Sequence, residues 1–342
     1  MSIVRIAALF ALALGLTASA YADRPVPQTG PARLRIASWN VEWLMLPATF
    51  DRLAPACDRG DDRGRDRRSG NRGGAARRSI PCDLVPDGRW SESDFDRLAT
   101  YARALDADVI VLQEVDGPDA ARRLLPGSGF CFTRRAHVQN VGFAIRAGIP
   151  FRCNADLREL GLDGDALRRG ADVTLYPGTR AELRLLGVHL KAGCVREPLD
   201  ADNDDCRQLA RQVPVLEQWI DAQARAGRPF VVAGDLNRLI ARERTTARDP
   251  RGRLQALWPE IDDADPPEAD LAYASESERA RGCTRRDRHR DFIDHIALSR
   301  TAARAIIPFS FRQHPYTDAT AGRRVPDHCA ISVDLAWPPA VR

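Results

Sequence analysis

The sequence has 342 residues and a net charge of only +4. A charge this small for the length gives no support by itself for nucleic-acid binding. The length suits one large domain or two small ones, and either could bury a sizeable core.

The N-terminus has the pattern of an export signal. Arg5 is followed by an apolar run over 6–16 and then by Ala18, Ala20 and Ala22, which fit an A-x-A cleavage site. This order is typical of a secretory signal peptide, so we predict one over residues 1–22. The run is shorter than the roughly 20 residues of a membrane span, and no later stretch is more apolar. We therefore expect a secreted or periplasmic protein without stable membrane insertion.

A strongly basic segment follows further along the chain. Residues 59–78 hold eight Arg, three Asp and five Gly, with no large apolar residue. We predict a mobile basic loop inside an Arg/Gly-rich insertion at about 57–82. Two interpretations stay open: a solvated low-complexity segment, or an arm that neutralises the backbone phosphates of a nucleic acid.

The eight cysteines all lie after the predicted signal. An even number of Cys behind an export signal indicates disulfides, and the absence of any C-x-x-C pair argues against structural zinc. Connectivity does not follow from the sequence, because eight Cys allow 105 pairings. We expect pairing in sequence order: Cys57 with Cys82, Cys131 with Cys153, Cys194 with Cys206, and Cys283 with Cys329.

Apolar runs of strand length recur along the chain, and all are too short for core helices. They lie at 34–37, 109–112, 141–145, 183–190, 230–233, 293–298 and 329–333. Helices are predicted at 93–107, behind a capping arrangement at 91–94, and at about 205–226, where Pro214 should kink the helix or mark its true start. Residues 239–290 look like charged surface excursions. Strands interleaved with two long helices, without regular βαβ alternation, favour a layered α/β sandwich over a doubly wound fold.

Polar residues interrupt or close these runs in six segments. Each places Asn, Asp, Glu or His beside the end of a buried strand, where an unpaired charge is costly unless it meets a metal or a partner. Taken singly, each has a structural explanation, such as a turn at Asp235 or a helix start at Glu114. The segments are SWNVEWL at 38–44, DVIVLQEVDG at 108–117, LLGVHLKAG at 185–193, FVVAGDLNR at 230–238, DFIDHIALS at 291–299 and VPDHCAISV at 325–333.

Together and in this order, the six segments resemble the endonuclease/exonuclease/phosphatase family. That family includes pancreatic-type deoxyribonuclease, apurinic-site nucleases, sphingomyelinases and inositol polyphosphate phosphatases. The resemblance extends from about Arg33 to Leu335. It implies a four-layer α/β sandwich, with two central mixed β-sheets flanked by helices, and a catalytic domain over residues 31–338.

The resemblance also implies a divalent-metal site. Glu114 corresponds to the main carboxylate ligand, and Asn40 lies beside it as a substrate or phosphate contact. Glu42 and Asp327 are implied at or near the metal. Oxygen ligands without a His or Cys cage suit Mg²⁺, Mn²⁺ or Ca²⁺, as hard-cation chemistry predicts independently.

Five catalytic residues are implied in the same way. Asp235 and Asn237 match a GDxN pair that positions the attacking water and the phosphate oxygens. Asp294 and His328 match a carboxylate and histidine that work as a couple, in which the carboxylate fixes the imidazole tautomer and raises its basicity. His189 matches a second histidine of deoxyribonuclease-like members. Which histidine is the base and which the acid stays open.

Two further residues are candidate substrate contacts. Asn140 falls near a family position that contacts the substrate. Lys191 is the single Lys among 51 basic residues, and a phosphate contact or a chance loop residue are equal alternatives for it. His295 is expected to pack structurally, and His137, His289 and His314 are expected on the surface or in loops.

The leading hypothesis is an exported nuclease that cleaves DNA or RNA non-specifically by attack of an activated water. One alternative is a sphingomyelinase-type phosphodiesterase or a phosphoinositide phosphatase. Such a lipid enzyme is expected to need an exposed apolar hairpin to enter a membrane, and the sequence shows no aromatic-rich loop of that kind. The other alternative is an inactive binding module of the same fold. The oligomeric state is left open.

Overall fold

A computed structural model describes residues 32–58, 80, 82–135, 137–284, 291–317 and 324–338. The predicted signal peptide at 1–22, the basic segment at 59–78 and His289 lie outside these residues. Within the described ranges, every helix is too short or too polar to cross a membrane.

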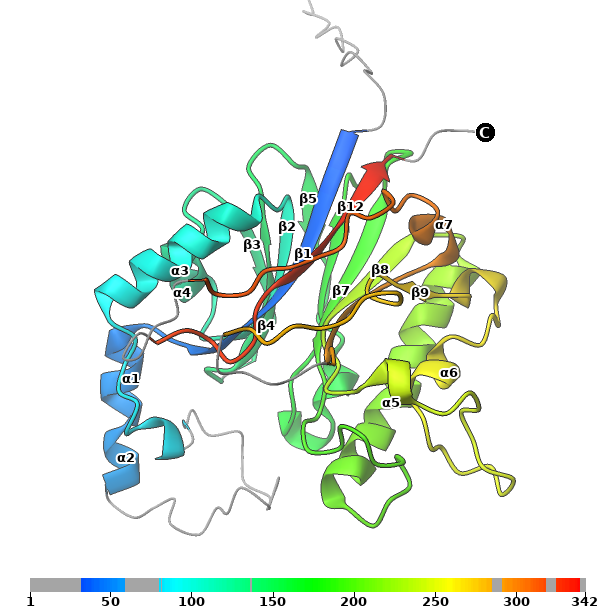
Figure 1. The fold of residues 1–342 in the computed structure, drawn as a ribbon, viewed down its shortest axis with the longest axis horizontal. Coiled ribbons are helices and arrows are strands. Elements are labelled where there is room, and N and C mark those ends of the chain that lie inside the picture. The colour runs from blue at the N-terminus through cyan, green and yellow to red at the C-terminus, as the bar shows by residue number, and fades with distance from the viewer. Residues whose placement is uncertain are drawn as a thin grey trace, which may run out of the picture. The chain divides into compact units, whose positions relative to one another are not determined.

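Two six-stranded mixed sheets form the centre of the fold (Figure 1). They share one plan, a central parallel pair with antiparallel strands on both sides. The first sheet consists of β11 (Arg312–Gln313), β12 (Ile331–Trp337), β1 (Ala32–Leu44), β2 (Val109–Val115), β4 (Asn140–Ile145) and β3 (Gly129–Phe132), in that order. The second consists of β5 (Phe151–Cys153), β6 (Ala171–Leu175), β7 (Leu183–His189), β8 (Phe230–Asp235), β10 (Asp294–Leu298) and β9 (Ala272–Tyr273).

The two sheets pack face to face through alternate residues of their strands. Ile36 and Val111 of the first sheet share one core with Leu185 and Val231 of the second. Because side chains alternate along a strand, the intervening residues face outward and meet the helices. This arrangement buries both faces of each sheet.

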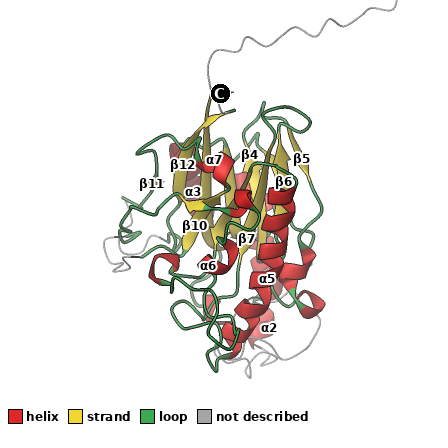
Figure 2. Cartoon of the chain, turned by 90° about the vertical axis from the view of Figure 1, so that its right-hand side faces the viewer, coloured by secondary structure: helices red, strands yellow, loops and turns green. Residues whose placement is uncertain are grey.

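Helices cover the two outer faces. On the first sheet lie α3 (Glu92–Leu105) and α4 (Pro118–Leu124), whose apolar side chains pack on Ile110 and Leu112. On the second lie α5 (Asp204–Arg225) and α6 (Trp258–Ile261), and Figure 2 shows α5 extending along the sheet. The predicted four-layer α/β sandwich is therefore confirmed. The remaining short helices are α1 (Pro47–Leu53), α2 (Pro55–Asp58) and α7 (Arg300–Ala303).

All seven predicted strand runs correspond to strands, and the capping arrangement before α3 is a capping box between Ser91 and Asp94. The sequence missed five strands: β3, β5, β6, β9 and β11. Four of these are short, with two to four residues. In β6, the buried Asp172 and Thr174 interrupt the apolar run, and Asp172 is neutralised by an ion pair with Arg184 at 2.7 Å.

Two expectations need correction. Pro214 does not mark the start of α5, which begins ten residues earlier at Asp204 behind an Asn203 cap, and the alternative of a kink at Pro214 stays a prediction. Burial of Leu209 and Leu216 on either side of the proline offsets the backbone hydrogen bond that it cannot donate. Nor are residues 239–290 only surface excursions, since Leu257 and Ile261 complete the core under α5.

The four disulfides pair the cysteines in sequence order, as predicted. Cys57–Cys82 joins the two ends of the Arg/Gly-rich insertion. Cys283–Cys329 ties the chain just after His328 to the segment that precedes β10.

Candidate active site

The polar clusters meet because of the strand directions. Parallel strands end at the same edge of a sheet, and their antiparallel neighbours begin there. The ends of β1, β2, β7 and β8 and the starts of β10 and β12 therefore lie at one end of the sandwich. The residues at these positions are Asn40, Glu114, His189, Asp235, Asp294 and His328.

Regular register brings three of them together on the second sheet. His189 pairs with Asp235 across β7 and β8, and Asp235 pairs with Asp294 across β8 and β10. Alternation along β8 places Asp235 on the same face as Val231 and Ala233, which pack in the core between the sheets. The three side chains thus point toward the first sheet.

On the first sheet, irregular backbone turns side chains toward the site. Strand β2 has a register shift between Gln113 and Val115, and Glu114 within it has a positive φ of 59°. Such a bulge re-aims a side chain that strict alternation would turn outward to the helices. Glu42 and Trp43, with φ of 46° and 52°, continue the pattern at the end of β1. Left-handed residues other than glycine are strained and cluster at functional sites.

Asn40 links the two sheets. Its Nδ2 lies 3.2 Å from Glu114 Oε1 and 3.3 Å from Asp235 Oδ2, so one amide donates toward carboxylates of both sheets. The backbone amide of Trp43 donates to the other oxygen of Glu114 at 3.2 Å. Glu114 is therefore held at both carboxylate oxygens, with 14% of its side chain exposed.

Three carboxylates crowd the first-sheet side. The backbone amide of Asp327 donates to Glu42 Oε2 at 3.1 Å. Burial, and then the charge of Asp327, raise the pKa of Glu42 to about 7. Burial also raises the pKa of Glu114, with a further contribution from Asp327 that the Asn40 hydrogen bond opposes. Glu42 and Glu114 are half-buried beside the exposed Asp327. Partly buried carboxylates without a cation are costly, so this set of oxygen donors fits a hard divalent cation.

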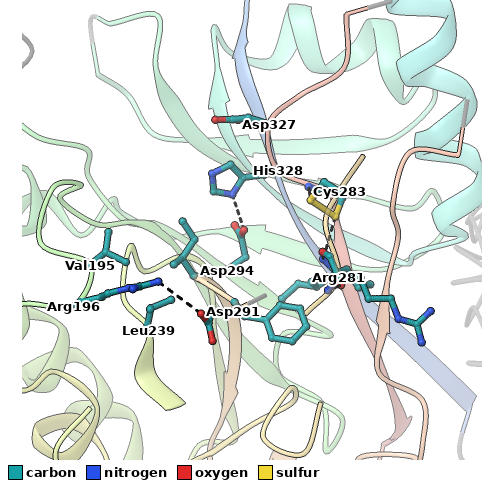
Figure 3. Close-up of a pocket in the computed structure, with 14 residues that line it drawn as sticks. Val195, Arg196, Leu239, Arg281, Cys283, Asp291, Asp294, Asp327 and His328 are labelled. Carbon is teal, nitrogen blue, oxygen red and sulfur yellow. Dashed lines mark hydrogen bonds and ion pairs between the residues drawn. A yellow bond between two sulfur atoms is a disulfide. The ribbon is translucent and has the colours of Figure 1, made fainter. Parts of the chain in front are cut away.

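His328 and Asp294 form a couple beside these carboxylates. His328 Nδ1 lies 2.6 Å from Asp294 Oδ2, and Figure 3 shows the two side chains facing one another. Burial opposes a charged imidazole, but Asp294, with Asp235 and Asp327, outweighs it and holds the pKa of His328 well above its usual value. The ligand atoms of Asp235, Asp294 and His328, the second candidate group for an ion, lie within 4.8 Å of one another, whereas those of Glu42, Glu114 and Asp327 do not all lie within that distance. We favour Glu114, Glu42 and Asp327 as the metal ligands, because His328 Nδ1 already bonds Asp294.

His189 has the opposite character. It is buried, and burial with the charge of Arg168 lowers its pKa well below the usual value. The ring is thus neutral at neutral pH. Its Nε2 lies 3.5 Å from Asp235 Oδ2 and 3.7 Å from Glu114 Oε1, while its Nδ1 has no hydrogen-bond partner among the described residues.

Asp235 occupies the centre of the group. Its Oδ1 accepts the backbone amide of Asn237 at 2.8 Å, and its Oδ2 lies between the two histidines, 4.0 Å from His328 Nε2. Burial, and then the charge of Asp294, raise its pKa to about 7. Asn237 has a φ of 52°, and its side-chain amide donates to the carbonyl of Leu190 at 3.1 Å.

Two predicted substrate contacts, Lys191 and Asn140, bond residues other than those of this group. Lys191 is bound by Asp205 of α5 at 2.6 Å and donates to the carbonyl of Ala192, so its phosphate contact stays a prediction. Asn140 donates to the carbonyl of His137 and lies 3.4 Å from Thr133 Oγ1. His295 is buried and bonds the carbonyl of Arg238 at 2.9 Å, consistent with the structural role expected for it.

Sequence reasoning missed Arg168 and Tyr316. Arg168 donates to the carbonyls of His189 and Leu190 at the end of β7, and its charge acts on Glu114 and Asp235. Tyr316 donates to the carbonyl of His328 at 2.7 Å and accepts from Trp39 Nε1 at 2.8 Å. Arg168 and Arg169 form an Arg-Arg pair just before β6, but in a chain so rich in Arg this pair did not stand out. Tyr316 had no motif around it.

A pocket of about 530 Å³ opens beside the couple (Figure 3). Asp294, Asp327 and His328 form one side of it. Phe292, Leu239 and the Cys283–Cys329 disulfide form apolar walls, and the exposed Arg196 and Arg281 also line it.

Known proteins resemble this chain in family and in fold. A family model described as the Endonuclease/Exonuclease/phosphatase family matches residues 37–318. Among curated proteins, none matches the chain in sequence. A solved structure of TDP2 from Caenorhabditis elegans is similar in fold, with 14% identity, a TM-score of 0.54, and coverage of 89% of this chain and 74% of that one.

A structure of TDP2 from D. rerio, complexed with a single-strand DNA product, is also similar. It has 17% identity and a TM-score of 0.52, with 89% of this chain and 98% of that chain covered. At these identities the likeness concerns the fold alone. The family match over most of the sequence and the shared fold establish that the chain belongs to the endonuclease/exonuclease/phosphatase family.

Proposed function

We propose that the protein is an exported, metal-dependent nuclease that hydrolyses phosphodiester bonds of DNA or RNA. The observation that carries this proposal is the position of Asp235 Oδ2 between two imidazoles of opposite character. His328 is cationic and His189 is neutral, and both Nε2 atoms lie 3.5–4.0 Å from this one oxygen. Both distances exceed that of a direct N–H···O hydrogen bond, and we propose that a water or substrate oxygen bridges the groups.

Three residues of the chain would carry the steps of hydrolysis. Asp235, oriented by the Asn237 amide, holds the attacking water and accepts its proton. His328, kept charged by Asp294, stabilises negative charge on the phosphoryl oxygens. The neutral His189 donates a hydrogen bond to the phosphoryl group or the leaving oxygen, because an imidazole that is not charged can still donate one proton.

Glu114, with Glu42 and Asp327 beside it, would hold a divalent cation, whose charge would offset that of the phosphoryl oxygens. We propose Mg²⁺, with Mn²⁺ or Ca²⁺ as alternatives, because all the donors are oxygens. Asn40 would orient Glu114 and contact a phosphoryl oxygen.

The pocket beside His328 favours a nucleotide over a lipid. Its volume of about 530 Å³, apolar walls and arginines suit a nucleoside with neighbouring phosphates. Among the described residues, Phe309 is the only exposed large hydrophobic side chain, which gives a lipid enzyme no cluster with which to enter a membrane. The DNA product bound to the similar TDP2 structure adds support by analogy.

The four disulfides support export, since such bonds persist in oxidising compartments. The proposal therefore includes cleavage of a signal peptide at residues 1–22 and a catalytic domain over 31–338. N-terminal sequencing of the protein recovered outside the cytoplasm tests this part, and an intact Met1 would contradict it.

A substrate panel tests the activity. The purified chain is incubated with DNA, RNA, sphingomyelin and phosphoinositides in Mg²⁺, Mn²⁺ or Ca²⁺, alongside His328→Ala. His314→Ala is the matched control, because His314 bonds Ser332 away from the site. We expect hydrolysis of DNA or RNA that the His328 variant loses and the control retains. Intact nucleic acids under all three metals would refute the nuclease, and hydrolysis of a lipid instead would favour the sphingomyelinase-type or phosphoinositide alternative.

The same panel addresses the inactive binding module. A module without chemistry has no reason to keep a charged couple beside a neutral buried histidine, which argues against it. Binding of a panel substrate with no turnover under any metal would nevertheless support that alternative.

A further inference from the structure

A second, smaller pocket lies on the Asn140 side of the site. It has a volume of about 280 Å³ and lies between α1, the turn from β2 to α4, and the loop from β3 to β4. Asn140 and Thr133 form part of its wall, and none of the catalytic residues lines it. Its polar side chains are those of Arg52, Asp116, Arg135 and His137, together with these two.

Arg135 is held rigidly at this pocket. Its Nε donates to the carbonyl of Asp165 at 3.0 Å, and its two terminal nitrogens donate to the carbonyls of Gln139 and Ala166. A guanidinium has five N–H donors, so two remain for a ligand. Burial, and then the charge of Arg168, lower the pKa of Arg135 to about 10, which leaves it cationic at neutral pH. A pre-organised, half-buried cation with spare donors is a good partner for a phosphate.

His137 adds a neutral donor. Its Nδ1 accepts the backbone amide of Gln139 at 3.0 Å, so the ring proton resides on Nε2. Burial, and then Arg135, lower the pKa of His137 to about 3, so this tautomer persists at neutral pH. Nε2 has no acceptor among the residues that the structure describes. It therefore adds a hydrogen-bond donor to the pocket without adding charge.

Arg52 supplies the second cation. It is exposed in the last turn of α1 and makes no ion pair with any described residue. Asp116 also lines the pocket, so two arginines against one aspartate give it a formal charge of +1. Arg135 is close enough to the catalytic centre for its charge to act on His189. The pocket therefore combines a net positive formal charge with a position near the catalytic centre.

We infer that this pocket binds the phosphate next to the scissile one in a nucleic-acid strand, held by Arg52, Arg135 and the His137 Nε2–H. The inference rests on the proposed function and deepens it. A strand would then have a phosphate at this pocket, the scissile bond at Asp235, and a nucleoside in the larger pocket beside His328. The catalytic site would require a substrate with at least two phosphates for full affinity.

Dinucleotide binding tests the inference. The affinities of TpT and of the same dinucleotide with an added 5′ or 3′ phosphate are measured by calorimetry in EDTA, so that no turnover is needed. We expect one of the two phosphorylated forms to bind the wild-type chain about tenfold more tightly than TpT, as one charge-assisted contact allows. Arg52→Gln and His137→Phe should each reduce that ratio to about threefold or less. Arg251→Gln, a control at an exposed arginine outside the pocket, should leave it unchanged.

Arg135 is not varied, because its three bonds to backbone carbonyls also support the loop. A ratio near one for both phosphorylated forms would overturn the inference, as would a tenfold ratio that both variants retain. Tighter binding of inositol 1,4-bisphosphate than of either dinucleotide would overturn the assignment to a nucleic-acid strand. Hydrolysis of nucleic acid with a ratio near one would refute this inference alone, whereas a tenfold ratio without any hydrolysis would refute the proposed nuclease alone.

Discussion

The two sheets share a strand plan but contribute different chemistry in different ways. On the first sheet, Glu114 and Glu42 reach the site through a bulge and left-handed backbone, and Glu114 keeps 14% of its side chain exposed. On the second sheet, His189 and Asp235 reach the site through regular register, with 3% and 2% exposed. The first sheet thus offers carboxylates that stay partly accessible, and the second offers groups that are almost fully buried.

This difference has an energetic reason. A carboxylate that awaits a cation must stay accessible, whereas an acid–base group gains a useful pKa from burial. Irregular backbone is costly, and it occurs where a side chain must leave the pattern of its strand. Strand order alone could not have supplied both environments.

Asp235→Asn should have the largest effect. The amide cannot accept a proton from water, so we expect kcat to fall by about 10³-fold on the substrate that the panel identifies. Circular dichroism would check folding, and Asp263→Asn, in the loop after α6, is the control. A fall in kcat of less than tenfold would mean that Asp235 is not the proton acceptor.

Glu114→Gln should come next, because it removes the main proposed metal ligand. We expect kcat to fall about 100-fold and metal-induced stabilisation to disappear. In the wild-type chain, a cation at 100 times its dissociation constant should add about 2.7 kcal/mol to the free energy of unfolding. Thermal melts with Mg²⁺ and with EDTA measure this difference. An equal shift in the variant would move the cation to the second group, Asp235, Asp294 and His328.

Tyr316→Phe should have a smaller effect on activity. It removes the hydrogen bonds to the His328 carbonyl and from Trp39, each worth about 1 kcal/mol. We expect kcat to fall up to about tenfold with KM nearly unchanged, since Tyr316 positions His328 and does not line the larger pocket. A change confined to KM would contradict this role.

Glu217→Gln should have the smallest effect, on stability alone. Burial, and then Asp221, raise the pKa of this half-buried α5 residue to about 8. The folded protein therefore holds a proton that the unfolded chain releases above about 4.5, so the free energy of unfolding falls as the pH rises from about 4.5 to 8. After a discount for solvent screening we expect the variant to gain about 1 kcal/mol, or about 2 °C in Tm, at pH 9. At pH 4 the wild-type chain and the variant should have the same Tm. A variant with a lower Tm than the wild-type chain at pH 9 would contradict the raised pKa of Glu217.

Much of the site could be predicted from the sequence because its residues interrupt apolar runs. Asp235 ends a buried strand, Asn237 follows it, and His328 lies just ahead of another, so local pattern places them at sheet ends. Asn140 and Lys191 also lie at or beside strand ends, and their roles stay predictions. The sequence pattern did not show that Asn140 bonds its own loop or that Lys191 pairs with Asp205 of α5.

By itself, the sequence determined the layered fold, seven of the twelve described strands and the disulfide-rich character. These follow from hydrophobic periodicity and cysteine count, which are local properties of the chain. Only the tertiary structure decided which histidine is charged, that Arg168 and Tyr316 support the site, and that Arg52, Arg135 and His137 share a pocket. Protonation and convergence depend on burial and on charges distant in sequence, and these exist only once the two sheets have packed together.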